Sequence, residues 1–110
     1  MPKYLCKANH TVEGTKGLLK DGGTSRRAAV TKIIEALGGK VGAYYYALGD
    51  VDLYFVAEMP DNMTVVASSL IANSPGTAEV NFTPLLTPEE MDESVAMANK
   101  MMAAYRPPGA

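Results

Sequence analysis

The fold is decided by a stretch in the middle of the chain, residues 40–59, which reads KVGAYYYALGDVDLYFVAEM. It contains two runs of β-branched, aromatic and other apolar residues, 40–48 and 51–59, on either side of Gly49-Asp50. A glycine beside an aspartate between two such runs favours a tight reversal. We therefore expect two neighbouring strands joined as an antiparallel hairpin.

The segments on both sides of this hairpin complete a repeating order. A helix is predicted over about 25–37, and a second one after a candidate N-cap at Asp61. Residues 3–10 and 77–84 alternate in polarity, as half-buried strands do. Residues 11–20 favour a turn or two of helix, interrupted by Gly14 and Gly17. The apolar face expected for the second helix consists of Met63, Val66, Ala67, Leu70 and Ile71.

The resulting order is strand, helix, strand, strand, helix, strand. Right-handed crossovers put both helices on the same side of a four-stranded antiparallel sheet, which is the ferredoxin-like βαββαβ arrangement of an α+β protein. An additional C-terminal helix is marked by Thr87-Pro88-Glu89-Glu90, a capping box with proline at the first helical position. A stripe at alternating four- and three-residue steps suits this helix to packing on one other element, and it consists of Met91, Val95, Ala98, Met102 and Tyr105.

The sheet face turned away from the helices is predicted to be of mixed character. Tyrosines are costly to leave in water as a cluster and are enriched at interfaces. We therefore expect two sheets to stack in a homo-oligomer, a dimer or larger, with a cavity between them. The residues assigned to this open face are Tyr44, Tyr46, Asp52, Tyr54, Glu58, Glu79 and Asn81.

Composition restricts the class of protein. A chain of 110 residues with 47% hydrophobic content fits a single domain, residues 1–110. A formal charge of −2 argues against a nucleic-acid partner. The single cysteine, Cys6, excludes an intramolecular disulfide and is expected to be a small buried residue, and no ligand cluster for a metal or other cofactor is present. No signal peptide and no run of about 18 apolar residues occur, so we expect a cytoplasmic protein without a membrane partner.

Several short strings, in their order and spacing, resemble one family. They are Gly17-Leu18-Leu19, Gly22-Gly23, Arg26-Arg27, Gly38-Gly39-Lys40, Gly49-x-x-Asp52, Pro60-Asp61 and residues 84–90. Together they resemble the GYD domain family, small bacterial and archaeal proteins of uncharacterised function. The Gly-Tyr-Asp string itself is replaced by Gly49-Asp50-Val51-Asp52. The resemblance implies a subunit of the dimeric α+β barrel type, a group that includes cofactor-free monooxygenases, isomerases and ligand-binding proteins.

Two residues are candidate catalytic groups. His10, the only histidine, could act as a general base, or could be a strand-end histidine bonded to backbone. Its position in the alternation puts it on the helix side of the sheet. Asp52 is the first choice among the acids, because a carboxylate among tyrosine rings can act as acid or base. The alternative for Asp52 and Glu58 is pairing with Lys3 or Lys7.

A second group of residues points to ligand binding. Arg26 and Arg27 lie in the first turn of a helix, where cations oppose the dipole, so either an anionic ligand beside Gly22-Gly23 or a salt bridge between subunits would explain them. Tyr44, Tyr46 and Tyr54, with Glu58 and Asn81, could contact a planar ligand, or could pack between sheets.

These observations lead to one leading hypothesis and two alternatives. The leading one is a homo-oligomer that binds a small organic molecule in a tyrosine-lined cavity. The first alternative is a cofactor-independent isomerase or monooxygenase with Asp52 or His10 as base. The second is an assembly subunit whose oligomer is its function. Whether the protein is an enzyme does not follow from the sequence.

Overall fold

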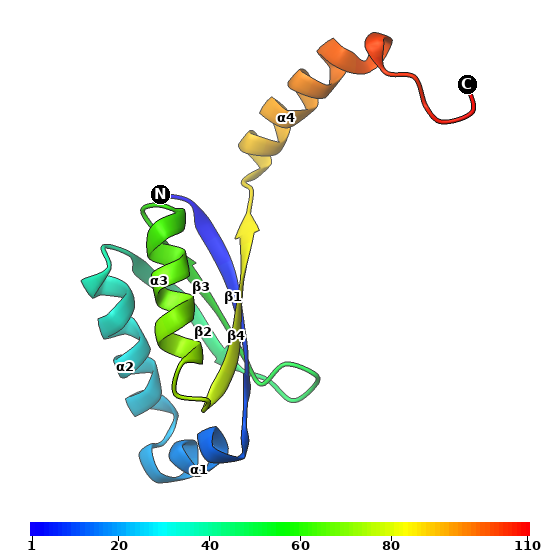
Figure 1. Ribbon diagram of the computed structural model, residues 1–110. Helices are drawn as coiled ribbons and strands as arrows, with labels where there is room; N and C mark the ends of the chain where they lie inside the picture. The colour runs from blue at the N-terminus through cyan, green and yellow to red at the C-terminus, as the bar shows by residue number, and fades with distance from the viewer.

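The chain folds into a four-stranded sheet with helices on one side and a separate helical arm (Figure 1). The computed structural model describes all residues, 1–110. In chain order the elements are β1 (Lys3–His10), α1 (Val12–Asp21), α2 (Gly23–Ala36), β2 (Lys40–Tyr46), β3 (Leu53–Glu58), α3 (Asn62–Asn73), β4 (Ala78–Leu85), α4 (Pro88–Met101) and a short 3₁₀ turn, Met102–Ala104. The strands are antiparallel in the order β2-β3-β1-β4. The ferredoxin-like prediction is confirmed.

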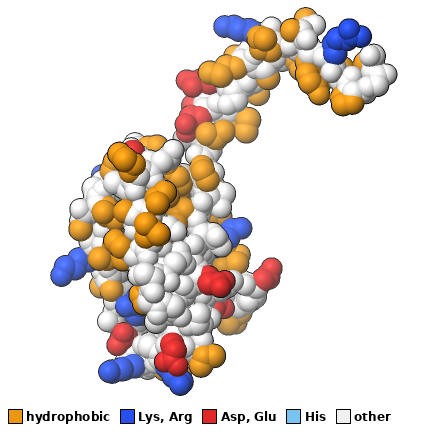
Figure 2. Space-filling view, in the orientation of Figure 1, with side chains coloured by type: hydrophobic (Ala, Val, Ile, Leu, Met, Phe, Trp, Pro, Cys, Tyr) orange, Lys and Arg blue, Asp and Glu red, His pale blue; other side chains and the backbone are white.

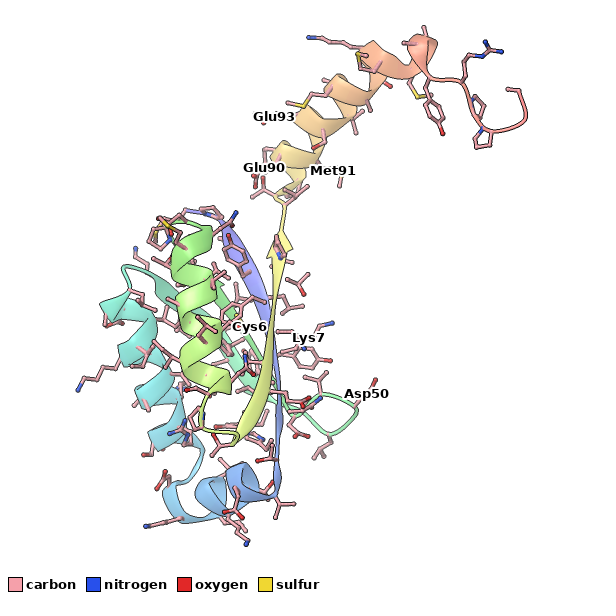
Figure 3. The ribbon with its side chains drawn as sticks, in the orientation of Figure 1. Cys6, Lys7, Asp50, Glu90, Met91 and Glu93 are labelled. Atoms are coloured by element: carbon pink, nitrogen blue, oxygen red, sulfur yellow. The ribbon has the colours of Figure 1, made fainter.

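The hydrophobic core lies between the sheet and the helices. Alternate residues of β1 and β3 point into it, because successive side chains of a strand face opposite sides. Its buried members are Tyr4, Cys6, Ala8, Ile34, Leu53, Phe55, Ala57 and Met59. The alternation predicted for residues 3–10 is therefore confirmed, and Lys7 points to the opposite side of the sheet from Cys6 (Figure 3).

The connection between β2 and β3 is longer than a tight turn. Residues 47–52 form a loop, closed by the backbone N–H of Ala47 donating to the carbonyl of Asp52 at 2.8 Å. The strands do pair antiparallel, as predicted, but the two-residue reversal at Gly49-Asp50 is wrong. Asp50 lies at the tip of this loop, away from the helices (Figure 3).

A β-bulge in β2 changes the face on which its tyrosines lie. Val41 is opposite Ala57, and Tyr44 is opposite Phe55, so β2 advances by three residues where β3 advances by two. Such an extra residue reverses the alternation beyond it. Tyr44 consequently stacks on buried Phe55, with ring centroids 5.4 Å apart. The placement of Tyr44 and Tyr46 on the open face is wrong, because both lie on the helix side.

Helix α1 runs unbroken through both of its glycines, contrary to the expected interruption. Thr11 caps it by accepting a hydrogen bond from the N–H of Gly14 at 3.2 Å. The hydroxyl of Thr11 also donates to the carbonyl of Gly76 at 2.8 Å. A Cβ at Gly14 would collide with the carbonyl oxygen of Thr77, so glycine is required for this close approach. Helix α1 is thereby fixed against the loop between α3 and β4.

Helix α3 turns a different side inward from the one predicted. Asp61 is its N-cap, as expected, within a capping box that involves Thr64. The sheet side consists of the half-buried Val65 and the buried Ser68. The expected apolar face is largely exposed, with Met63 77%, Val66 56%, Leu70 66% and Ile71 47% accessible. Figure 2 shows hydrophobic side chains gathered on the part of the domain where α3 lies in Figure 1.

Helix α4 extends away from the domain (Figure 1). Its capping box at Thr87 and Glu90 is present, with Pro88 in the first turn, as predicted. None of its residues is buried. The radius of gyration of 18.0 Å exceeds the roughly 13 Å of a compact chain of this length because of this arm. No helix, α4 included, has the length and apolar character needed to cross a membrane.

Candidate functional site

A cavity of about 480 Å³ lies on the helix side of the sheet. Helices α2 and α3 form its sides, the strands form its floor, and α1 lies at one end. Of the 24 residues that line it, 15 are hydrophobic, so it suits an organic molecule with a largely apolar body. The predicted cavity was between the sheets of two subunits; this one is formed within a single chain.

His10 and Asp52 meet at this cavity. His10 lines it from the end of β1, and Asp52 comes from the loop before β3. One carboxylate oxygen, Oδ2 of Asp52, accepts the backbone N–H of His10 at 2.9 Å and lies 3.6 Å from Nδ1 of the imidazole. The backbone N–H of Asp52 donates to the carbonyl of Ala8 at 3.1 Å, which holds the loop against β1.

The His10–Asp52 contact bears on whether His10 could act as a base, which the sequence left open. His10 was predicted to lie on the helix side of the sheet, away from the cavity expected on the open face. The cavity of the structure lies on the helix side, so this objection to a catalytic His10 no longer applies. The imidazole is 17% exposed, and no side-chain hydrogen bond engages its Nε2 atom. A base with one nitrogen beside a carboxylate and the other nitrogen free has the arrangement that proton abstraction needs. His10 is therefore the candidate base, and Asp52 is the residue placed to orient it.

An aromatic wall is formed by Tyr44, Tyr46 and Phe55. Tyr44 and Tyr46 contact edge to face, with ring centroids 5.7 Å apart. The Tyr46 hydroxyl donates to the carbonyl of Gly23 at 3.2 Å, which ties β2 to the first residue of α2. Burial, and next the neighbouring Tyr46 hydroxyl, raise the pKa of Tyr44, while Arg26 and Arg27 act in the opposite sense. The Tyr44 hydroxyl thus stays protonated well into alkaline solution and remains a hydrogen-bond donor.

Helix α2 begins at Gly23, so Arg26 and Arg27 lie past its first turn and not in it as predicted. Arg26 lines the cavity, whereas Arg27 does not. Neither forms an ion pair within the chain, where the only contacts of this kind are Lys16–Glu13 and the His10–Asp52 contact described above. Glu13 and Asp21 also line the cavity, at the end formed by α1. The charge around the cavity is therefore mixed, which does not favour an anion over a neutral polar ligand.

Ser68 is a functional candidate that the sequence did not suggest. It is 3% exposed, lines the cavity from α3, and its hydroxyl has no hydrogen-bond partner in the protein. A buried hydroxyl without a partner is unfavourable, so a partner from a bound molecule would stabilise it. The sequence does contain a hint of it, because Val65, Ser68 and Ala72 are spaced by three and four residues and so share one face of a helix. The larger apolar residues on another face of α3 led to the prediction that the other face points inward.

The remaining predicted residues do not line this cavity. Tyr54 lies on the open face of the sheet, opposite Lys7 and Tyr45 on the adjoining strands. Glu58 is opposite Lys3 but forms no ion pair with it, and Asn81 is exposed on β4. Cys6 lies in the core, where burial raises its thiol pKa to about 12, so it is unreactive near neutrality. The site thus brings together His10, Asp52, Arg26, Tyr44 and Tyr46, and leaves Arg27, Tyr54, Glu58 and Asn81 outside.

Comparison with known proteins gives one match. Functionally described proteins and solved structures yield no significant match. The sequence model of the GYD domain matches residues 4–95, which include all of β1 except Lys3, the other three strands, helices α1 to α3 and the first half of α4. Since this match covers most of the 110 residues, the chain belongs to the GYD domain family.

Proposed function

We propose that the protein binds a small organic molecule in the cavity between α2 and α3. The observation that carries the proposal is a cavity of about 480 Å³ whose mostly apolar lining includes a few polar residues. Pockets of this size, apolar with a small number of orienting polar groups, are the usual form of small-molecule sites. The ligand would lie against the Tyr44–Phe55 stack.

The polar groups define the ligand more closely. Ser68 has a free hydroxyl, Arg26 has no acidic partner, and His10 has a free ring nitrogen. All three can donate a hydrogen bond or, for Ser68 and His10, accept one. A planar or aromatic body with one or two oxygen groups, such as a ketone or a phenol, would give them hydrogen-bond partners.

A fluorescent apolar probe tests this binding. N-phenyl-1-naphthylamine is uncharged and brightens in apolar sites, so its titration reports a dissociation constant. Gly17 lines the cavity, and a Cβ there would meet no atom within 4 Å, so Gly17→Leu adds a side chain beside the ligand space. Gly49→Leu is the matched control, since Gly49 has equally open surroundings and lies in the β2–β3 loop.

The two variants should differ. We expect Gly17→Leu to weaken probe binding about tenfold or more, equivalent to about 1.4 kcal/mol, and Gly49→Leu to bind like the native protein. Equal binding by all three proteins would show that the probe adheres to the exposed surfaces of α3 or α4, and the cavity proposal would fail.

Proton transfer is a second candidate function, favoured by the His10–Asp52 contact. His10 would take a proton from the carbon beside a carbonyl group, and Tyr44 would donate a hydrogen bond to the enolate oxygen that forms. Return of the proton to another carbon gives an isomerisation that needs no oxidant or cofactor. Exchange of the methyl protons of acetophenone for deuterium, followed by NMR, measures the first step.

The expected effects separate the two residues. Loss of the base in His10→Ala should lower the exchange rate by about 10²-fold or more, and Asp52→Asn should lower it less, because the base is retained but less well oriented. Both variants should still bind the naphthylamine probe. If the native protein gives no exchange above buffer, binding alone is the function of the cavity.

A homo-oligomer and a cytoplasmic location are further parts of the proposal, and the open sheet face is one candidate interface between subunits. The open sheet face carries Tyr45, 70% exposed, and Tyr54, 37% exposed, from adjoining strands. Two exposed rings side by side suit an interface more than a free surface. Native mass spectrometry of the purified protein would report both the number of subunits and any retained small molecule.

A further inference from the structure

Two apolar surfaces of this chain lie uncovered on different helices. The first is the α4 stripe, which consists of Met91, Val95 and Ala98 on α4, followed by Met102 in the 3₁₀ turn and Tyr105 just after it, because the helix ends at Met101 and not at Tyr105 as the stripe predicted. Its large side chains are between 48% and 68% exposed. The second is the α3 outer patch, which consists of Met63, Val66 and Leu70, between 56% and 77% exposed. Both surfaces are visible as hydrophobic areas in Figure 2.

We propose that the α4 stripe of one copy packs on the α3 outer patch of a second copy. The exchange is reciprocal, so each copy gives its arm and receives its partner's, and the product is a homodimer with two-fold symmetry. One type of contact then covers both surfaces. This dimer is independent of the cavity and of its ligand.

The connection to α4 directs the arm away from its own domain. β4 ends at Leu85 and α4 begins at Pro88, so only two residues join them. Thr87 is extended, with φ −73° and ψ 160°, and the proline that follows restricts it to that region. The chain continues through these two residues without reversing, so α4 leads away from α3 (Figure 1). Figure 3 shows α4 leading away from the domain beyond Glu90 and Met91, which lie at the base of the arm.

An isolated helix of this length is marginal in water, and α4 requires a partner surface for stability. The sequence supplies this helix with a capping box, a first-turn proline and first-turn acids. Such signals stabilise the ends but leave the apolar stripe in water. A partner helix would remove that cost.

The α3 outer patch is suited to receive α4. Helix α3, Asn62–Asn73, has no charged residue, so packing on it buries no unpaired charge. The charges of α4 lie off the stripe, at positions 89, 90, 92, 93 and 100. The two helices, with 14 and 12 residues, would be about 21 and 18 Å long.

The surface area that the two copies would bury also favours a reciprocal exchange of arms. A single contact made by a four-turn helix buries little area compared with the roughly 800 Å² that each partner buries in a stable interface. Reciprocal exchange forms this contact twice and so doubles the buried area. Pairing of α4 with the partner's α4 would supply it once, and would leave the α3 outer patch in water.

Charge substitutions test the proposal on the full chain. Val95→Lys lies on the α4 stripe, and Met97→Lys, two residues on and 68% exposed, lies off it. Leu70→Lys lies on the α3 outer patch, and Leu48→Lys in the β2–β3 loop is its control. Light scattering over a concentration series should show a native dimer. Burying a lysine at two symmetric sites should weaken dimerisation by about 100-fold or more, whereas both controls should remain dimeric.

Cysteine cross-linking identifies the contact itself. Chains with Val66→Cys alone and chains with Val95→Cys alone are mixed and oxidised, and the native Cys6 is too buried to interfere. A disulfide between the two kinds of chain is expected, and Met97→Cys should form far less of it.

Other results would overturn the proposal. A native protein that is monomeric at all concentrations would do so, as would a dimer that survives Val95→Lys, which would point to pairing through the open sheet face. Preferred disulfides between two Val95→Cys chains would indicate pairing of the two α4 helices. A disulfide within one chain carrying both substitutions, with no cross-linked dimer, would indicate that α4 folds back on its own α3.

Discussion

The domain formed by residues 1–85 and the arm formed by residues 86–110 are built from equally clear sequence signals, but only the domain has a core. In the domain, Phe55 and Ala57 are almost inaccessible, whereas in the arm the least exposed large residue of the stripe, Val95, is 48% exposed. Capping boxes occur in both, at Asp61 and at Thr87. The difference shows that local signals determine where a helix begins, and that tertiary contacts determine what it buries.

The difference between the domain and the arm should be largest when a large side chain is truncated to alanine in each of them. Phe55→Ala removes a buried ring that stacks on Tyr44, and should lower the free energy of unfolding by about 3–5 kcal/mol. Met97→Ala in the arm should change it by less than about 0.5 kcal/mol. Urea unfolding followed by circular dichroism measures both. A large cost for Met97→Ala would show that the far side of α4 is also packed, which would remove the contrast between the two regions.

A pair of glycines in α1 makes the contrast sharper within one helix. Gly14→Ala would place a Cβ against the carbonyl of Thr77, and overpacking of this kind should cost about 1–3 kcal/mol. Gly17→Ala meets no atom within 4 Å and should stabilise the protein by about 0.5–1 kcal/mol, because alanine favours the helix. The change in unfolding free energy, measured by thermal and by urea unfolding, should have opposite signs in the two variants. The same sign for both would mean that α1 does not close the end of the cavity as described.

Alkaline pH should weaken the domain through Cys6. The pKa of its thiol is raised from 9.0 to about 12 by burial, so above pH 9 the unfolded chain loses this proton while the folded chain keeps it. The stabilisation is complete below pH 9 and falls as the pH rises towards 12, by at most about 1.4 kcal/mol for each pH unit. Burial of Tyr44 acts in the same direction. The slope of unfolding free energy between pH 9 and 10.5 should be smaller in Cys6→Ala, and an unchanged slope would contradict the buried thiol.

The smallest expected effect concerns Ser68. Ser68→Ala removes a buried hydroxyl that has no partner, and should stabilise the ligand-free protein by about 1 kcal/mol. Ser94→Ala is the control in the arm, where the hydroxyl donates to the carbonyl of Glu90 in full contact with water. Its effect on unfolding should be close to zero. Destabilisation by Ser68→Ala would indicate that the hydroxyl is already satisfied, and would weaken the argument for a ligand partner.

The sequence predicted the backbone of this protein well. The order of elements, the alternation in β1 and the caps at Asp61 and Thr87 were all correct, because each depends on neighbouring residues. The inward side of α3 was not predicted, since the most apolar stripe of a helix is inside only when something covers it. Ser68 was missed for the same reason.

The candidate site was predicted only in part. His10 was correctly placed on the helix side, yet its partner Asp52 is 42 residues away, and the loop that joins them has no local signature. Tyr44 and Tyr46 were placed on the wrong face, because a bulge is set by the pairing of two strands and is not encoded in the polarity of one. A long-range contact and a register shift were therefore the two features that only the structure supplied.

The bulge in β2 decides which face of the sheet receives the tyrosine wall. Val41 and Tyr44 enclose Gly42 and Ala43, where β2 is one residue longer than its partner requires. Loss of one of these two residues would remove the bulge and leave Tyr44 two positions after Val41, so both phenol rings would stay on the inside. The unaltered sequence paired without a bulge would instead turn both rings to the outer sheet, so a local irregularity of pairing separates a binding wall from an adhesive surface.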